Sequence, residues 1–116
     1  PVFLYDYPAR TSPLAAPHPE NPEMAQRFEL YMAGLEICNG CKELADPEFQ
    51  KRRFERELKR RRTAGLPEYP LPSAFLEALA DMPEASGCAL GVDRLVMLLT
   101  DSAAIDEVVA FPPDAF

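Results

Sequence analysis

The alternation of apolar and polar residues near the start of the chain predicts an antiparallel sheet. Residues 2–7 form one expected strand. Residues 26–33 and 35–39 form two more, because their side chains alternate in the two-residue period of a half-buried sheet. Ala33-Gly34 between the last two predicts a tight hairpin turn with Gly34 at a positive φ.

Capping and stop signals predict two helices in the middle of the chain. Asp46 is a favourable N-cap and Pro47 a favourable first residue for a helix that continues to about Thr63. Its apolar stripe is thin, so we expect this helix on the surface. Ser73 is expected to cap a second helix over residues 74–80.

The last third of the chain completes the predicted architecture. Residues 87–92 form a glycine-punctuated strand, and residues 93–100 form a helix whose apolar positions 95–99 are typical of a buried element. Residues 108–111 (VVAF) predict a short strand or an extended end. Strands before, between and after segregated helices predict an α+β fold, with an antiparallel β-sheet flanked by helices.

Composition and charge narrow the class of protein. A length of 116 residues with 47% apolar residues predicts one globular domain at most, and thirteen prolines divide it into short elements, with an irregular connection over residues 8–22. The net charge of −7 argues against a general nucleic-acid binder, although residues 51–62 (KRRFERELKRRR) concentrate the cations. We expect no membrane span and no signal peptide, and three cysteines fit a reducing cytoplasm. The chain begins as if a strand were already under way, so we expect a piece of a longer protein.

Two glutamates on the hairpin are the first candidate site. If Met32 pairs with Leu35 across the turn, Glu29 lies opposite Cys38 and points to the same side as Glu36. Two carboxylates repel unless a cation lies between them, and Mg²⁺ held together with substrate phosphates suits such a pair. The alternative is the solvated face of a hairpin.

Two more segments carry candidate chemistry. Asn39 and Glu43, expected on a loop past the hairpin, can bind an amino acid, the carboxylate answering an ammonium group. In residues 87–94 (GCALGVDR), small residues let a flat ligand approach the backbone, and Arg94 at a helix start can stack on a base and reach phosphate. The alternative for Asn39 and Glu43 is a solvated loop. The alternative for residues 87–94 is a glycine-bulged strand with an arginine–aspartate ion pair.

Two other clusters are less specific. A zinc site of Cys38, Cys41, Cys88 and His18 is disfavoured, because a single CxxC pair is a weak signal and Cys38 lies in mid-strand. The basic run at 51–62 is typical of a solvated helix face, and otherwise suits an acidic partner.

Taken in chain order, these signals resemble the end of the class II lysyl-tRNA synthetase core. The start of the chain and the tail are similar to neighbouring strands of that core, so the match covers essentially all of residues 1–116. The resemblance predicts the C-terminal portion of such a catalytic domain. The residues that carry it are Arg27-Phe28-Glu29, Glu36, Asn39-Gly40, Glu43-Leu44, and the GxxxGxDR motif that ends at Arg94.

The resemblance implies how ATP would be held. Glu29 and Glu36 would bind Mg²⁺ against the ATP phosphates. Gly91 and Arg94 would belong to the ATP-binding motif 3, whose catalytic arginine stacks on adenine and contacts the terminal phosphate. Motifs 1 and 2, upstream of this chain, would supply a homodimer interface and a further phosphate-binding arginine.

The resemblance also implies the amino acid and its acceptor. Asn39 and Glu43 would line a lysine pocket, with Glu43 pairing to the side-chain ammonium, and lysyl-adenylate would form before transfer. Ala89 replaces a family glycine beside the amino acid, and residues 53–72 resemble the branch that lysylates elongation factor P. One methyl group in a tight pocket is worth about 1–3 kcal/mol of discrimination. These departures favour (R)-β-lysine and elongation factor P over the alternative, a genuine lysyl-tRNA synthetase that charges tRNA.

Overall fold

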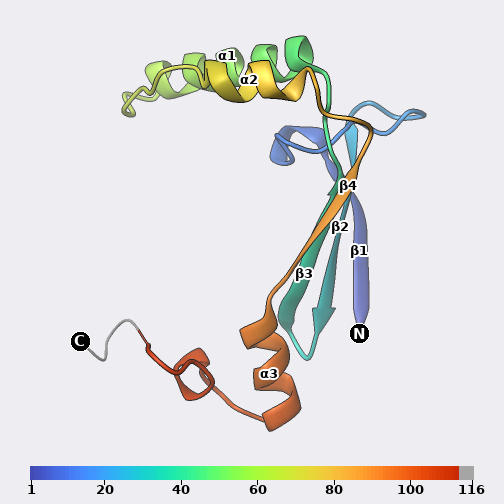
Figure 1. The fold of residues 1–116 in the computed structure, drawn as a ribbon, viewed down its shortest axis with the longest axis vertical. Coiled ribbons are helices and arrows are strands. Elements are labelled where there is room, and N and C mark those ends of the chain that lie inside the picture. The colour runs from blue at the N-terminus through green and yellow to red at the C-terminus, as the bar shows by residue number, and fades with distance from the viewer. Residues whose placement is uncertain (113–116) are drawn as a thin grey trace.

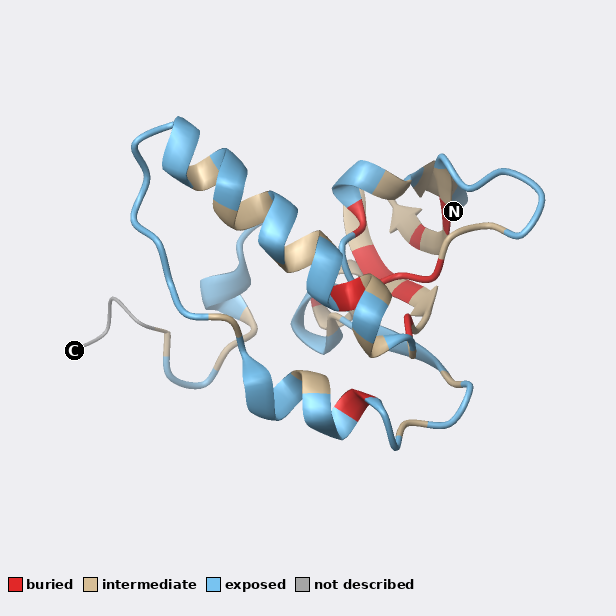
Figure 2. Cartoon of the chain, turned by 90° about the horizontal axis from the view of Figure 1, so that it is seen from above, coloured by how far each residue is buried: buried red, intermediate tan, exposed pale blue. Residues whose placement is uncertain are grey.

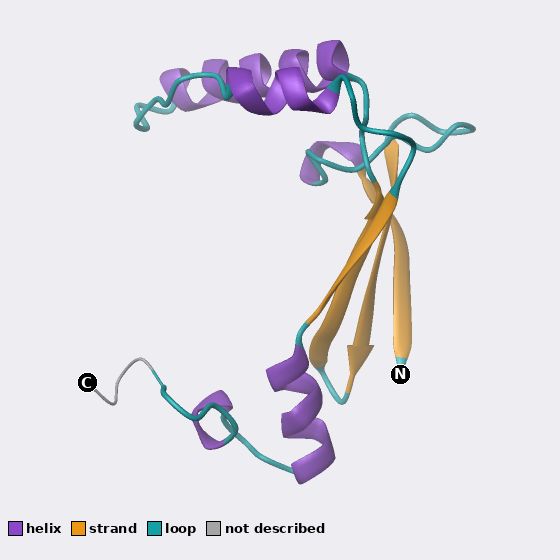
Figure 3. Cartoon of the chain, in the orientation of Figure 1, coloured by secondary structure: helices purple, strands orange, loops and turns teal. Residues whose placement is uncertain are grey.

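The chain is built on one antiparallel sheet with helices beyond its two ends (Figure 1; Figure 3). We describe residues 1–112 of a computed structural model. Its four strands lie in the order β1-β2-β3-β4, and each neighbouring pair is antiparallel. The predicted α+β class with an antiparallel sheet is therefore confirmed. The strands are β1 (Val2–Pro8), β2 (Met24–Met32), β3 (Leu35–Lys42) and β4 (Ser86–Leu90).

The β2–β3 hairpin has the predicted turn but not the predicted register. Ala33 and Gly34 both have positive φ, 49° and 82°, as a two-residue hairpin turn of the mirror-image type requires. The pairing of Met32 with Leu35 is confirmed. The predicted pairing of Glu29 with Cys38 is wrong, because the register shifts by one residue beyond the turn.

A β-bulge at Ile37 causes this shift. Tyr31 pairs with Glu36 but the next residue of β2, Leu30, pairs with Cys38, so that Ile37 is the extra residue. Because side chains alternate between the two faces of a sheet, one extra residue turns every later side chain of that strand to the other face. Asn39 consequently lies opposite Glu29, within a strand that continues to Lys42, and not on the loop expected from the sequence.

The helix α1 (Pro47–Thr63) has the predicted bounds and its predicted surface position, with Gln50 as its buried residue. The carboxylate of Asp46 accepts a hydrogen bond from the Phe49 amide at 2.9 Å, which confirms the N-cap. The helix α2 (Ser73–Leu79) lies along α1, but the expected cap by Ser73 is wrong: Pro72 occupies the cap position without a side-chain bond.

The C-terminal elements differ more from expectation. The helix α3 (Val92–Thr100) follows β4 directly, but it is not a buried helix, because only Met97 is buried and Leu99 is 78% exposed. No strand forms at residues 108–111; a 3₁₀ turn, Ile105–Glu107, precedes them. A second 3₁₀ turn, Ala9–Thr11, lies in the proline-rich connection.

The core is small for this length. Figure 2 shows most buried residues where the sheet meets the loop between β1 and β2. Most of α1 and α2 is exposed or intermediate. The radius of gyration is 17.6 Å, whereas a compact chain of this length has a value of about 13 Å. Within residues 1–112, no helix has the length and apolar character needed to cross a bilayer. The buried apolar residues are Ala15, Ala16, Ala25, Ile37, Cys38, Leu44, Leu79 and Met97.

Candidate functional site

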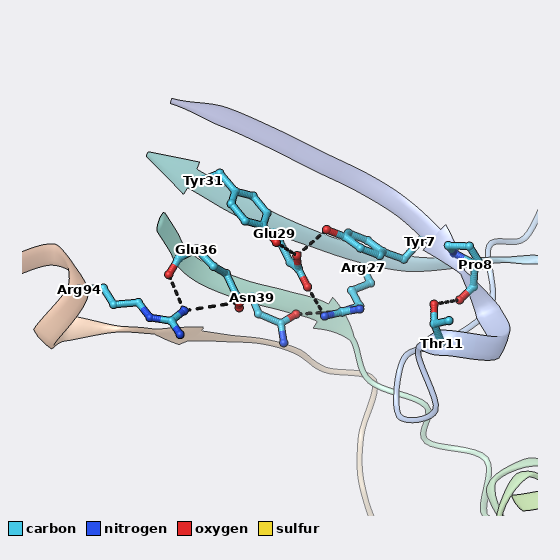
Figure 4. A network of polar contacts seen from close by, with 9 residues as sticks. All are labelled: Tyr7, Pro8, Thr11, Arg27, Glu29, Tyr31, Glu36, Asn39 and Arg94. Carbon is cyan, nitrogen blue, oxygen red and sulfur yellow. Dashed lines mark hydrogen bonds and ion pairs between the residues drawn. The ribbon is translucent and has the colours of Figure 1, made fainter. Parts of the chain in front are cut away.

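One face of the sheet collects the candidate residues. Arg27, Glu29 and Tyr31 alternate along β2 and share this face. Because of the bulge, both Glu36 and Asn39 lie on it as well, although an odd spacing would otherwise place them on opposite faces (Figure 4). We call this surface the site face.

Glu29 is the most constrained acid on the site face. It is only 7% exposed, and its Oε2 atom accepts hydrogen bonds from the hydroxyls of Tyr7, at 2.5 Å, and Tyr31, at 2.7 Å. The Arg27 guanidinium forms an ion pair with Oε1 and also lies over the Tyr7 ring, 4.4 Å from its centroid. Three side chains, one from β1 and two from β2, therefore hold the Glu29 carboxylate in place.

These contacts determine the charge of Glu29. The hydrogen bonds from Tyr7 and Tyr31 lower the pKa of the Glu29 carboxyl, and Arg27 lowers it further, against the opposing effect of burial. The pKa of the Tyr7 hydroxyl is raised by burial and by its bond to Glu29. At neutral pH the face therefore carries an ionised carboxylate held by neutral tyrosines.

Glu36 and Arg94 form the second fixed pair. The Arg94 guanidinium donates to the Glu36 backbone carbonyl at 2.8 Å and lies 3.5 Å from its carboxylate (Figure 4). The amide of Gly91 donates to the carbonyl of the bulged residue, Ile37, at 2.8 Å. The β4–α3 junction is thus attached to the bulge, and Arg94 is oriented at the end of the site face.

Asn39 and Ala89 lie opposite each other on β3 and β4. The Asn39 side-chain oxygen accepts a hydrogen bond from Arg27 Nε at 3.0 Å, so its amide nitrogen is available for another acceptor. Ala89 is exposed. Its methyl group therefore borders whatever binds beside Asn39.

Glu43 differs from the other two acids of the site. It follows β3, and its backbone is held by a bridge to Ala15 and by donation to the Ala85 carbonyl at 3.0 Å. Its carboxylate interacts with the Cys41 thiol, whose pKa is raised by burial and then by the Glu43 charge. In the part of the chain that the structure describes, Glu29 and Glu36 each pair with an arginine, and Glu43 pairs with no cation.

The donor set suits a magnesium ion shared with phosphates better than an all-protein metal cage. Among residues 1–112 no three acidic, cysteine or histidine side chains converge on one point. A carboxylate offers about four lone-pair sites, and Glu29 uses three of them for Arg27, Tyr7 and Tyr31. Mg²⁺ needs only one or two carboxylates when phosphates complete its shell, and Glu29 with Glu36 fits that need.

The cysteines do not converge as a zinc site would require. All three are free thiols, and Cys38 interacts with Cys88, but Cys41 does not join them. Cys38 pairs with Leu30, a residue of the opposite face of β2, whereas Cys41 lies on the site face beside Glu43. His18 lies in the first loop, where its ring accepts a hydrogen bond from the Glu20 amide.

Several site residues were not foreseen from the sequence. Arg27 and Tyr31 could have been found, because they alternate with Phe28 and Leu30 and so share the face of Glu29. The contribution of Tyr7 depends on an irregular β1–β2 pairing next to Asp6, whose φ is 57°, and no local pattern signals it.

Comparison with known proteins identifies the family. Residues 1–115 match the family of class II tRNA synthetases of the D, K and N type. The chain belongs to this family, which confirms the resemblance inferred from the hairpin acids and the GxxxGxDR motif.

The most similar relatives fall into two groups. The elongation factor P–(R)-β-lysine ligase of Erwinia tasmaniensis is 47% identical over 115 residues, which are 98% of this chain and 35% of the relative. The corresponding ligase of Proteus mirabilis is 48% identical over 113 residues, again 35% of its length. The lysine–tRNA ligase of Prochlorococcus marinus subsp. pastoris is 47% identical over 113 residues, which are 97% of this chain and 22% of the relative. The chain therefore spans about a third or a fifth of these relatives, and identity does not separate the two groups.

Proposed function

We propose that this chain supplies the amino-acid-binding and nucleotide-binding face of an ATP-dependent lysine-activating ligase. The observation that carries the proposal is the contrast among three acids of one site. Glu29 and Glu36 are each balanced by an arginine, and Glu43 has no cationic partner within residues 1–112. A half-buried carboxylate of this kind is suited to the ammonium group of a substrate.

In this proposal each residue has one task. Glu43 accepts hydrogen bonds from the side-chain ammonium of lysine, and Asn39 lines the same pocket, where its amide nitrogen can donate to an oxygen of the amino acid. Arg94 stacks on the adenine and contacts the terminal phosphate of ATP. The lysine carboxylate then forms a bond to the α-phosphorus, pyrophosphate leaves, and lysyl-adenylate remains. The residues of the chain act by positioning and by charge, in a site fixed before the ligands arrive.

Two acids of the site face are assigned to the metal that accompanies ATP. Glu29 and Glu36 would hold Mg²⁺, which supplies neutralisation of phosphate charge when bound. The lowered pKa of Glu29 keeps its carboxylate ionised for this purpose. The Tyr7 and Tyr31 hydroxyls orient it in advance.

We further propose that the acceptor is elongation factor P and the amino acid (R)-β-lysine. Ala89 supports this, because its methyl group stands beside Asn39, where a glycine would leave room. The relatives of both groups are equally similar, so the proposal rests on this residue and on the basic segment at 53–72 rather than on identity. Charging of tRNA is the competing function.

The first experiment separates amino-acid from nucleotide binding in the full-length protein that contains this chain. Lysine-dependent exchange of pyrophosphate into ATP is measured for Glu43→Gln and Glu36→Gln. Glu43→Gln should raise the KM for lysine by roughly tenfold or more, the loss of one charge-assisted hydrogen bond, with little change in the KM for ATP. Glu36→Gln should instead shift the magnesium dependence. Equal loss of the same parameter in both variants would show that the division of roles is wrong.

The second experiment identifies the acceptor. The same protein is supplied with α-lysine or (R)-β-lysine, and transfer to elongation factor P is compared with transfer to tRNA. We expect labelling of the protein factor and preference for the β-amino acid, with Ala89→Gly shifting the preference toward α-lysine. Efficient charging of tRNA without labelling of elongation factor P would assign the chain to the tRNA-charging group.

A further inference from the structure

Gly87, the second residue of β4, lies directly opposite Cys41 and beside the carboxylate of Glu43. A Cβ atom built on Gly87 would stand only 2.9 Å from Glu43 Oε1. The φ of Gly87 is not in the left-handed region, so its backbone conformation is open to other residues. The absence of a side chain is therefore needed for space.

Gly40 is the other glycine of the sheet where an added Cβ atom would be too close to a neighbour, but the neighbouring atom is of a different kind. A Cβ on Gly40 would meet the Phe28 ring at 2.6 Å, and that ring packs against Phe3. At Gly87 the only close atom among the described residues is Glu43 Oε1, the far end of a flexible side chain. A methyl group at Gly40 therefore disturbs packing, whereas one at Gly87 displaces a carboxylate and leaves the sheet in place.

We propose that Gly87 is a positioning residue for amino-acid recognition. Its missing side chain lets the Glu43 carboxylate lie against β4, at the place where it meets the ammonium group of the substrate. Because the backbone of Glu43 is fixed by Ala15 and Ala85, the side chain alone must yield to a methyl group. The inference rests on the proposed role of Glu43.

The test uses Gly87→Ala in the full-length protein that contains this chain, with lysine-dependent pyrophosphate exchange as the readout. A methyl group must push the carboxylate away by about half an ångström or more to reach ordinary contact, which weakens a hydrogen bond that depends on distance. We expect the KM for lysine to rise roughly tenfold, while the KM for ATP changes by less than about twofold. Cys88→Ala is the matched control on the same strand, since the Cys88 thiol interacts with Cys38 and not with Glu43, and it should match the wild type.

A double-variant cycle separates positioning from a general effect on structure. In the Glu43→Ala background no carboxylate remains to be displaced, so adding Gly87→Ala should change the KM for lysine by no more than about twofold. A further large rise in that background would show that Gly87 acts through the sheet, and it would overturn the inference.

The remaining outcomes separate the inference from the proposed function. If Glu43→Ala raises the KM for lysine and Gly87→Ala does not, Gly87 has no positioning role and the function of Glu43 stands. If Glu43→Ala leaves that KM unchanged, the proposed function itself is wrong. If Gly87→Ala does not fold, the double variant with Glu43→Ala should fold, because the crowded atom is gone; failure of both would overturn the inference.

Discussion

At the scale of single residues, the site face is organised by how each acid is neutralised. The Glu29 carboxylate accepts hydrogen bonds from two tyrosine hydroxyls and forms an ion pair with a guanidinium. Its pKa is therefore lowered although the side chain is almost wholly buried. A buried carboxylate without such donors would be protonated instead. The hydroxyls of Tyr7 and Tyr31 therefore stabilise the charge of Glu29, and Glu43 is the one of the three site acids without a cationic partner among the described residues.

Tyr7→Phe tests this arrangement through its dependence on pH. The variant keeps the ring over Arg27 but removes one donor to Glu29, so we expect a loss of about 1–2 kcal/mol in the free energy of unfolding at neutral pH. Because the fold lowers the pKa of Glu29, the stabilisation is present above the ordinary carboxyl value of 4.5 and disappears as the pH falls through the lowered pKa. Thermal unfolding of the full-length protein from pH 8 to below pH 4 should show the two curves converging only at the acidic end. Tyr5→Phe, on the same strand but paired with Phe28 and so facing away from Glu29, should match the wild type throughout.

At the scale of elements, the bulge at Ile37 decides which residues can cooperate. The alternation of Phe28, Leu30 and Met32 predicts the strand and the face of Glu29, and Ala33-Gly34 predicts the turn. No local pattern marks Ile37 as an extra residue. The pattern alone therefore predicts Cys38 opposite Glu29, whereas Asn39 occupies that position. The same limit applies to α3, whose apolar run predicts burial: a sequence pattern reports that a surface needs covering, but not which segment covers it.

Helix α1 contributes to the site through the loop that precedes β2. The Arg53 guanidinium donates to the carbonyls of Ser12, Pro13 and Ala15 at 3.2, 3.0 and 2.8 Å. That loop in turn pairs with the end of β3, where Leu44 donates to the Leu14 carbonyl at 3.0 Å. The helix thereby holds the backbone on either side of Glu43.

Arg53→Ala should loosen this loop without unfolding the sheet. Removing the charged donor from three carbonyls costs about 1.5–3 kcal/mol locally, so hydrogen–deuterium exchange at the amides of Ala16 and Leu44 should accelerate by roughly 10- to 100-fold. Arg56→Ala, one turn further along α1 and exposed, is the control and should leave these rates unchanged. Unaltered exchange in Arg53→Ala would show that the backbone ladder alone fixes the loop.

At the scale of the whole molecule, the chain leaves much apolar surface uncovered. Along β1, Val2, Phe3, Leu4 and Tyr5 are each 48–73% exposed, and Leu99 of α3 is 78% exposed. A surface hollow of about 420 Å³ lies along α1, and one of about 520 Å³ reaches the site face only at Arg27, Cys41 and Gly87. Neither hollow is lined by the residues assigned to ligands, which are Glu29, Glu36, Asn39, Glu43, Ala89 and Arg94. The site face is therefore an open strip of sheet, whereas small-molecule sites bury most of their ligand.

The 116-residue chain expressed alone should accordingly fail to activate lysine. Arg27 and Arg94, the guanidinium groups seen on the site face, are each engaged by a carboxylate, so no described cation there is free to neutralise the α-phosphate during attack. We expect no lysine-dependent pyrophosphate exchange above the blank, together with strong binding of a hydrophobic dye to the uncovered strands. The full-length protein should be active and bind far less dye. The contrary result is pyrophosphate exchange by the isolated chain that is lost in its Glu43→Ala variant. That result would show that the site face is sufficient for activation. It would also show that Arg94 leaves Glu36 when ATP binds and neutralises the phosphate charge.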